Sequence, residues 1–401
     1  MRKNLLKTLI GLAIGAFFVW LSAKDWPYDK LVGPVSLEAG HLVVGNVAVP
    51  EGTLAPEALA TMDGWAVELV WFLPFLAILA LIHVLRVVRW RPLLDPIVKL
   101  DFTTHNRIGA VGFMAMFLFP LRLGELVRPF LVKRAAAQLP RSPGADAEPR
   151  VRMTAVLATV VVERIVDGLV VTLCLFAVMS FLPGSSDSAS ELRVGAWAAL
   201  AVFAGAALLL AGARWQAELT RKVVHKTAGL VSKRLAHAID SLLESFLSGL
   251  RRLPNARAFA GFIAITIVYW GLNGLGVWCM VQAFHLPIDM VGAYAMMACV
   301  VVGMMIPNSP GNVGSFWYFL LLPVALYGVG NATAQAIAFG LSVWLCQLVQ
   351  QTAFGLWFVV RGKVSWKGVV AATYEDESTL AAPLPAEPLP TEPAESRAAI
   401  S

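Results

Sequence analysis

Long hydrophobic runs without charge dominate the chain. Ala258–Phe284 has 27 consecutive residues and Gln335–Val360 has 26 without Asp, Glu, Lys or Arg. A transmembrane helix needs about 20. With the other apolar runs, these predict an all-α polytopic membrane protein with about six full spans. The expected spans are Leu5–Ala23, Ala66–Leu85, Met153–Leu182, Gly195–Ala213, Ala258–Phe284 and Gln335–Val360.

Two further apolar pairs are too short to span. Ile108–Pro120 has 13 residues, which is about 20 Å of helix, and Leu121–Val132 is similar, whereas the hydrocarbon core is about 30 Å thick. Because basic clusters flank this pair on both sides, we expect it to enter and leave the membrane on the cytoplasmic face. Such a re-entrant segment needs protein or a water-filled cavity around its broken backbone.

The second pair is Met290–Ile306 and Ser315–Val329, and the segment that joins it has two prolines and two glycines in eight residues. Since this joint carries no Lys or Arg, we expect it to enter from outside. The residues expected to form the two re-entrant turns or hinges are Pro120, Gly124, Pro307, Pro310, Gly311 and Gly314. Oppositely oriented broken pairs are typical of inverted-repeat transporters. The alternative is a bundle with short or kinked helices.

The composition supports this class of protein. Of the 401 residues, 58% are hydrophobic and only 14% charged, against about 25% charged in soluble domains. The mean hydropathy is +0.70. These values exclude a soluble enzyme, a disordered chain and a disulfide scaffold. The four cysteines lie in apolar runs and the six histidines show no metal-ligand spacing, so we expect no metal and no cofactor.

The basic residues predict the orientation. Of the 32 Lys and Arg, 25 flank the spans on one side, and only Lys24, Lys30 and Arg193 fall on the other. The positive-inside rule therefore places both termini in the cytoplasm and loop 24–65 outside, with a hairpin through Val35–Val44. The net charge of +6 then reports orientation and does not indicate a nucleic-acid partner.

Two cytoplasmic segments are predicted outside the spans. Apolar residues recur at helical spacing within 214–257, with Lys and Arg opposite. This pattern favours an amphipathic helix on anionic lipid headgroups, and a partner-binding helix is the alternative. The tail, residues 373–401, is rich in Pro, Glu and Ala and is expected to be disordered.

Charged residues at membrane depth form the candidate site. They are Arg122, Glu125, Arg128, Glu163, Arg164 and Asp167. The first three share a helical face if that segment is helical. Each unpaired charge costs about 3 kcal/mol at the midplane, so we expect the six, which sum to zero, to pair or to face water. They are either an ionic staple or groups that hold a charged substrate, and arginine suits phosphate. We expect Asn273, Gln347, Gln350 and Gln351 to form interhelical hydrogen bonds.

Three motifs together resemble a known family. They lie at 120–129, 163–167 and 307–314, and Arg89-Trp90 fits an earlier motif. The chain resembles the lysylphosphatidylglycerol synthase transmembrane-domain family, also called flippase-like proteins, over Leu5–Arg361. The family's third motif often has a second glycine where this chain has Asn312. The resemblance implies a flippase-like domain over 1–372. Its six charged residues would line or brace a lipid headgroup path.

The expected function follows from this resemblance. Family members include the membrane half of bacterial multiple peptide resistance factors, which moves aminoacylated phosphatidylglycerol between leaflets. We expect an inner-membrane protein that moves or binds a phosphate-containing lipid, such as an anionic phospholipid or a polyprenyl phosphate, and is not an enzyme. The alternative is a scaffold for a glycosyltransferase or lipid synthase. Changing Gly311 and Gly314 together to alanine is expected to preserve folding and stop movement.

Overall fold

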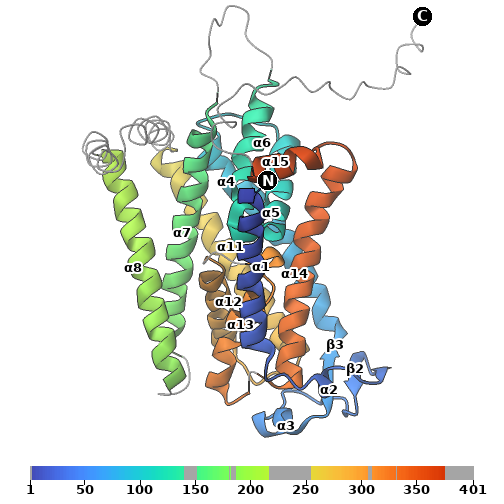
Figure 1. Ribbon diagram of the computed structural model, residues 1–401. Helices are drawn as coiled ribbons and strands as arrows, with labels where there is room; N and C mark the ends of the chain where they lie inside the picture. The colour runs from blue at the N-terminus through green and yellow to red at the C-terminus, as the bar shows by residue number, and fades with distance from the viewer. Residues whose placement is uncertain are drawn as a thin grey trace, which may run out of the picture.

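The computed structural model describes residues 2–139, 151–179, 181, 187–215, 254–305, 309–330 and 332–374 (Figure 1). Its long helices are α1 (Arg2–Ala23), α4 (Phe72–Leu94), α7 (Met153–Met179), α8 (Asp187–Trp215), α11 (Ala256–Ala283) and α14 (Ala334–Val360). Shorter helices are α2 (Tyr28–Leu31), α3 (Pro56–Thr61), η1 (Leu69–Trp71) and α15 (Trp366–Tyr374). Pro307, most of the predicted amphipathic helix (216–253) and the tail from 375 lie outside the described residues.

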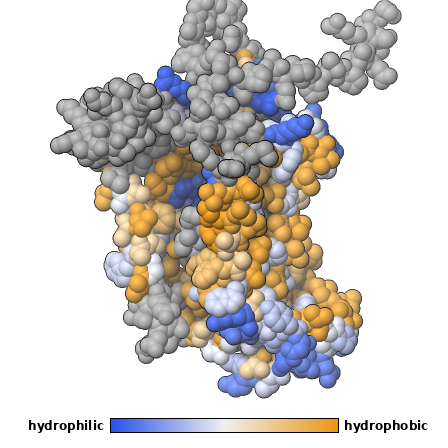
Figure 2. Space-filling view, viewed as in Figure 1, coloured by the Kyte–Doolittle hydropathy of each residue, from blue (hydrophilic) through white to orange (hydrophobic). Residues whose placement is uncertain are grey.

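The long helices make this a multi-pass membrane protein. Within the described chain, four stretches are long and apolar enough to cross a membrane: Leu5–Ala23, Leu69–Leu94, Ala256–Ala283 and Ala334–Val360. Helix α7 has 27 residues but carries three charged side chains within it. On the face shown in Figure 2, hydrophobic residues cover the middle of the molecule and hydrophilic residues gather toward the sheet end.

The expected second span, Ala66–Leu85, is wrong at both ends. Gly64–Glu68 is strand β3, and its Ala66 backbone is held by the Gln335 side chain, which accepts from the amide at 2.9 Å and donates to the carbonyl at 2.7 Å. Helix α4 then continues to Leu94. Arg86 and Arg89, which the sequence assigned to a cytoplasmic flank, are therefore inside the helix.

A small sheet caps one end of this mostly helical protein. Strands β1 (Val35–Glu38), β2 (His41–Gly45) and β3 pair antiparallel in that order. The predicted hairpin through Val35–Val44 is confirmed, and β3 joins it with His41 opposite Glu68. In Figure 1 the sheet lies at the end of the molecule opposite α15.

Each half of the chain has a long helix, a broken segment and a second long helix. The first broken segment is α5 (Phe102–Leu118), η2 (Pro120–Leu126) and α6 (Val127–Ala136). The second is α12 (Met290–Met304), η3 (Pro310–Asn312), α13 (Ser315–Leu321) and η4 (Leu322–Tyr327). Helix α4 packs on α11, α5 on α14 and α12 on α7, so exchanging the halves preserves the packing pattern. Figure 1 places α5 and α6 toward α15, and α12 and α13 toward the sheet.

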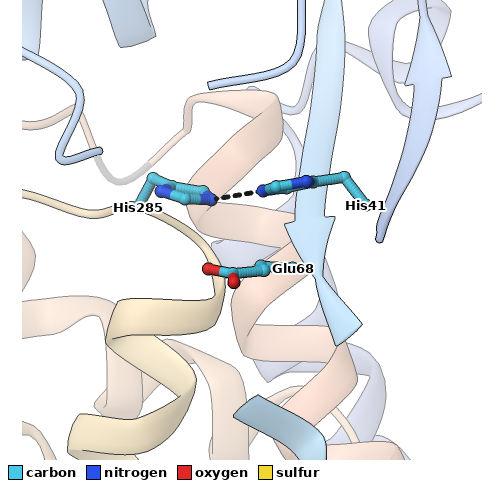
Figure 3. Close-up of side chains that lie close together, drawn as sticks. All are labelled: His41, Glu68 and His285. Carbon is cyan, nitrogen blue, oxygen red and sulfur yellow. Dashed lines mark hydrogen bonds between the residues drawn. The ribbon is translucent and has the colours of Figure 1, made fainter. Parts of the chain in front are cut away.

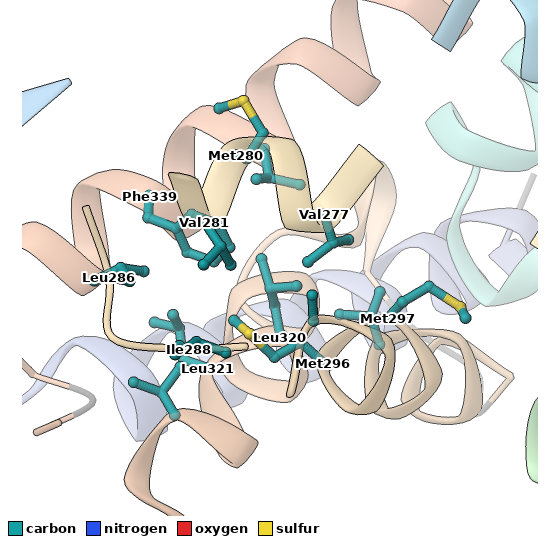
Figure 4. Close-up of a cluster of buried hydrophobic side chains, with 14 of the residues drawn as sticks. Val277, Met280, Val281, Leu286, Ile288, Met296, Met297, Leu320, Leu321 and Phe339 are labelled. Atoms are coloured by element: carbon teal, nitrogen blue, oxygen red, sulfur yellow. The ribbon is translucent and has the colours of Figure 1, made fainter. Parts of the chain in front are cut away.

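A hydrophobic core holds the second broken segment in place. Side chains of α11, α12, α13 and α14 interdigitate in it, joined by two from the α11–α12 connection (Figure 4). It includes Val277, Met280, Val281, Leu286, Ile288, Met296, Met297, Leu320, Leu321 and Phe339. Buried packing of this kind positions a segment whose backbone is not continuous helix.

Helix α1 covers both breaks through two glycines one turn apart. A Cβ on Gly11 would lie 2.3 Å from the Pro120 side chain, and one on Gly15 would lie 2.6 Å from that of Ser309. Close approach of this kind is the usual role of small residues at membrane-helix interfaces. The first and second broken segments are therefore held by the same helix.

Replacing Gly15 with leucine is expected to lower the melting temperature by several degrees. The added side chain must displace α1 from Ser309, and overpacking typically costs about 1–3 kcal/mol. Thermal unfolding of the purified protein measures the change. Gly205→Leu is the control, because a Cβ there has open space. Equal losses in the two variants would contradict this role for α1.

Candidate functional site

A buried ionic cluster lies between α4, α6 and α7, with Arg89 at its centre. Arg89 is 1% exposed. Its Nη2 lies 2.8 Å from Glu163 Oε1 and 2.8 Å from Asp167 Oδ2, and its Nη1 also pairs with Asp167. Trp270 Nε1 donates to Asp167 Oδ1 at 3.0 Å. Arg89 therefore bridges both acids of α7.

Two more arginines form ion pairs with Glu163. Arg128 Nη1 donates to Glu163 Oε2 at 2.8 Å, and Arg164 Nη2 donates to Oε1 at 3.1 Å. Arg128 is buried, whereas the Arg164 side chain is 21% exposed. A Cβ on Gly112 would lie 2.2 Å from Arg128 Cγ, so this glycine makes room for the arginine. The cluster ties the first broken segment to α7, as an ionic staple would.

Arg122 and Glu125 form a separate pair. Arg122 Nε donates to Glu125 Oε1 at 3.0 Å, and its Nη1 donates to the Met304 carbonyl at 3.3 Å. Leu121 and Arg122 have φ of 55° and 58°, a left-handed conformation that is costly for residues with side chains. The segment is therefore not a continuous helix, and the predicted shared face with Arg128 is wrong.

The expected hinge residues have different roles. Gly124 is a close contact, because a Cβ there would lie 2.2 Å from the Ala115 carbonyl. Pro310 and Gly311 lie in η3, where Gly311 has φ 67° and its carbonyl accepts from Trp344 Nε1 at 2.8 Å. Gly314 has φ 82°, and a Cβ there would lie 2.6 Å from the backbone of α1. The close approach at Gly314 and the positive φ at both glycines argue against the expectation that Gly311→Ala with Gly314→Ala preserves folding.

An open pocket with a cavity volume of about 110 Å³ lies between the two breaks. Its polar lining includes Arg122 of η2, Asn312 of η3, and Arg164 of α7. Other polar residues are Arg86, Tyr269, Asn273, Gln347 and Gln351, and four methionines contribute to the apolar part. None of the described residues that line it is acidic.

Arg86 is a charged residue of the pocket lining that the sequence did not place among the candidate site residues. It donates to Gln351 Oε1 at 3.0 Å and to the Tyr269 hydroxyl at 2.8 Å, and its guanidinium lies 4.6 Å from the Phe113 ring centre. The Gln351 contact joins α4 to α14, as predicted for this amide. In the described part of the chain, no acid forms an ion pair with Arg86.

The pocket and the cluster together carry a surplus of positive charge. They contain five arginines, namely Arg86, Arg89, Arg122, Arg128 and Arg164, and three acids, namely Glu125, Glu163 and Asp167. The neutral set expected from the sequence omitted Arg86 and Arg89. Three of these arginines, Arg86, Arg122 and Arg164, line the pocket, and no acid is among its described lining residues.

The family model for the lysylphosphatidylglycerol synthase TM region matches residues 51–355. The chain belongs to this family. No curated protein matches the chain. The family match includes both broken segments, the ionic cluster and the pocket lining. Helices α1 and α15 lie outside it.

Two features of this lysylphosphatidylglycerol synthase TM region have a structural reason. Asn312 has φ 54°, and asparagine tolerates this left-handed conformation better than most residues with side chains do. In the sequence, only the match of Arg89-Trp90 to a family motif indicated that Arg89 has a role. Trp90 is fully buried and donates to Thr159 Oγ1 at 3.0 Å, so both residues of the pair anchor α4 on α7.

Proposed function

We propose that the pocket binds the phosphate-containing headgroup of a membrane lipid and that the chain moves this headgroup between leaflets. The observation that carries the proposal is a pocket between two broken helical segments, with three arginines and no acid among its described lining residues. In this proposal the chain breaks no bond of the lipid.

The chemistry of the lining supports an anionic headgroup. Arg122 and Arg164 are each about one-fifth exposed, so part of each guanidinium is available to a ligand. Guanidinium groups bind phosphate oxygens through paired, charge-assisted hydrogen bonds. The amides of Asn273 and Gln347 add donors that suit phosphate or hydroxyl oxygens. An anionic headgroup also offsets the surplus positive charge.

The arrangement of the two halves supports movement across the membrane. Broken segments that point from opposite ends, and packing that is preserved when the halves are exchanged, are typical of inverted-repeat transporters with a central site. In this proposal the two breaks are re-entrant and the acyl chains stay in the bilayer. The end with α15 faces the cytoplasm of a bacterial cell, in accord with the basic flanks.

Reconstitution into vesicles tests the proposal. The purified chain is expected to move fluorescent phosphatidylglycerol between leaflets faster than protein-free vesicles do, and faster than it moves fluorescent phosphatidylcholine, whose headgroup carries no net charge. A fluorescent polyprenyl phosphate tests the second lipid class. If no phosphate-containing lipid moves faster than in protein-free vesicles, the proposal fails and a scaffold for a glycosyltransferase or lipid synthase is favoured.

A further inference from the structure

A second polar cluster lies apart from the pocket, where the sheet meets the α11–α12 connection. His41 begins β2, Glu68 ends β3, and His285 lies in the connection. Because His41 and Glu68 are opposite each other in the ladder, their side chains project from the same face of the sheet. The His285 ring points toward the His41 ring, and the Glu68 carboxylate lies below the two rings (Figure 3). Donor atoms of all three lie within 4.8 Å of one another.

The two ring nitrogens that face each other are close enough to share one proton or one metal ion. His41 Nε2 lies 3.1 Å from His285 Nε2, and both residues are buried. His41 Nδ1 lies 3.2 Å from the Ala39 carbonyl oxygen. Since a carbonyl only accepts, Nδ1 holds the proton of a neutral ring and Nε2 presents a lone pair to His285. A proton or a metal ion between the two nitrogens satisfies this arrangement.

The donor set matches a metal site. Two imidazoles and a carboxylate form one of the common three-ligand zinc sets. Nitrogens bound to a tetrahedral zinc at about 2.0–2.1 Å lie about 3.3 Å apart, close to the 3.1 Å between the two Nε2 atoms. The backbone also holds the His41 ring, through the Ala39 carbonyl. Hydrogen bonds from the far side of the ring are usual for histidine ligands.

We propose that His41, Glu68 and His285 bind a divalent transition-metal ion of the zinc class and so fasten the sheet to the α11–α12 connection. Nitrogen donors favour such ions over Mg²⁺ and Ca²⁺, which prefer oxygen. Three protein ligands leave a fourth position for water or an external ligand. His285 has φ 52°, a costly conformation that directs its ring toward the strands. The site does not depend on the proposed lipid movement.

Metal content and thermal stability of the full chain test this site. Protein carrying no oligohistidine tag is stripped with a chelator, incubated with ZnCl₂, desalted and analysed by mass spectrometry. We expect about one zinc per chain and a melting temperature raised by about 5 °C at a zinc concentration roughly 100 times Kd, with no rise in Mg²⁺ or Ca²⁺. Glu68→Gln and His285→Asn should bind zinc at least 10-fold more weakly. Glu57→Gln, an exposed acid on α3, is the control and should bind as the wild type does.

Two results would overturn the proposal. One is wild-type protein that retains no zinc, and the other is unchanged zinc binding in Glu68→Gln and His285→Asn. Should these variants fail to fold, Co²⁺ added to the wild type decides. The proposed site predicts visible bands of four- or five-coordinate cobalt without a thiolate charge-transfer band, because no cysteine is among its ligands. A spectrum of hexaaqua cobalt would reject the site.

Discussion

Replacing Arg89 with leucine is expected to cost about 3–5 kcal/mol of stability, the usual loss when a buried ion pair loses one partner. Asp167 would keep only the Trp270 hydrogen bond and a 3.6 Å contact with Arg164. Glu163 would keep two arginines. We therefore expect poor expression and a melting temperature lowered by about 6–10 °C, measured by thermal unfolding in detergent.

The exposed neighbour Arg91 provides the control. It pairs with Asp95 at 3.6 Å and its side chain is 47% exposed, and exposed pairs contribute only about 0–1 kcal/mol. Arg91→Leu should therefore unfold near the wild-type temperature. Adding Asp167→Asn to Arg89→Leu should restore part of the loss, because it removes one of the two stranded charges. Equal losses in Arg89→Leu and Arg91→Leu would show that the buried network is not what holds α4 to α7.

The charged residues that the sequence offered for an ionic staple included Arg164 and not Arg89. Arg164 lies between the two acids along α7, so it looked like their natural partner. The structure shows that Arg89 reaches the same acids from α4, across 74 and 78 residues of sequence. Spacing along one helix cannot reveal such a contact. We therefore expect Arg164 to contribute less to folding than Arg89 does, and it lines the pocket, which Arg89 does not.

Hydropathy predicted the long helices and chain-breaking residues predicted the two broken segments, because these features depend on local sequence. The ends of α4 could not be predicted in this way. Its three arginines, Arg86, Arg89 and Arg91, come after an apolar run, which is the usual pattern of a cytoplasmic flank. Helix α4 continues past these arginines because it packs against α7 and α11, and this packing places Arg86 and Arg89 within the helix bundle.

Long-range contacts explain the remaining differences. Strand β3 forms because it pairs with β2 and because Gln335, 269 residues away, bonds to Ala66. His41 and His285 are 244 residues apart, so the spacing of histidines could not bring them together. The three-residue spacing of Arg122, Glu125 and Arg128 predicted one helix face, but Leu121 and Arg122 have left-handed backbone conformations. Arg122 pairs with Glu125, whereas Arg128 pairs with Glu163.

Replacing Arg164 with glutamine should instead leave a folded protein that moves anionic lipid at least 10-fold more slowly. Folding survives because Glu163 keeps Arg89 and Arg128, and Asp167 keeps Arg89. Movement slows because Arg164 lines the pocket, and a hydrogen bond to a charged group contributes about 1.5–3 kcal/mol. The vesicle assay with fluorescent phosphatidylglycerol measures the rate, and Arg91→Gln is the matched exposed control.

Arg164→Lys separates charge from geometry at the same position. Lysine keeps the charge but lacks the planar, two-pronged donor of arginine. If the pocket only attracts anions, lysine should restore most of the rate. If it holds a phosphate by paired hydrogen bonds, Arg164→Lys should remain slow while folding normally, and the charge-neutral change Arg122→Gln with Glu125→Gln should also be slow. A well-folded Arg164→Gln protein that moves lipid at the wild-type rate would show that headgroups do not pass Arg164, and the proposed route through the pocket would have to be abandoned.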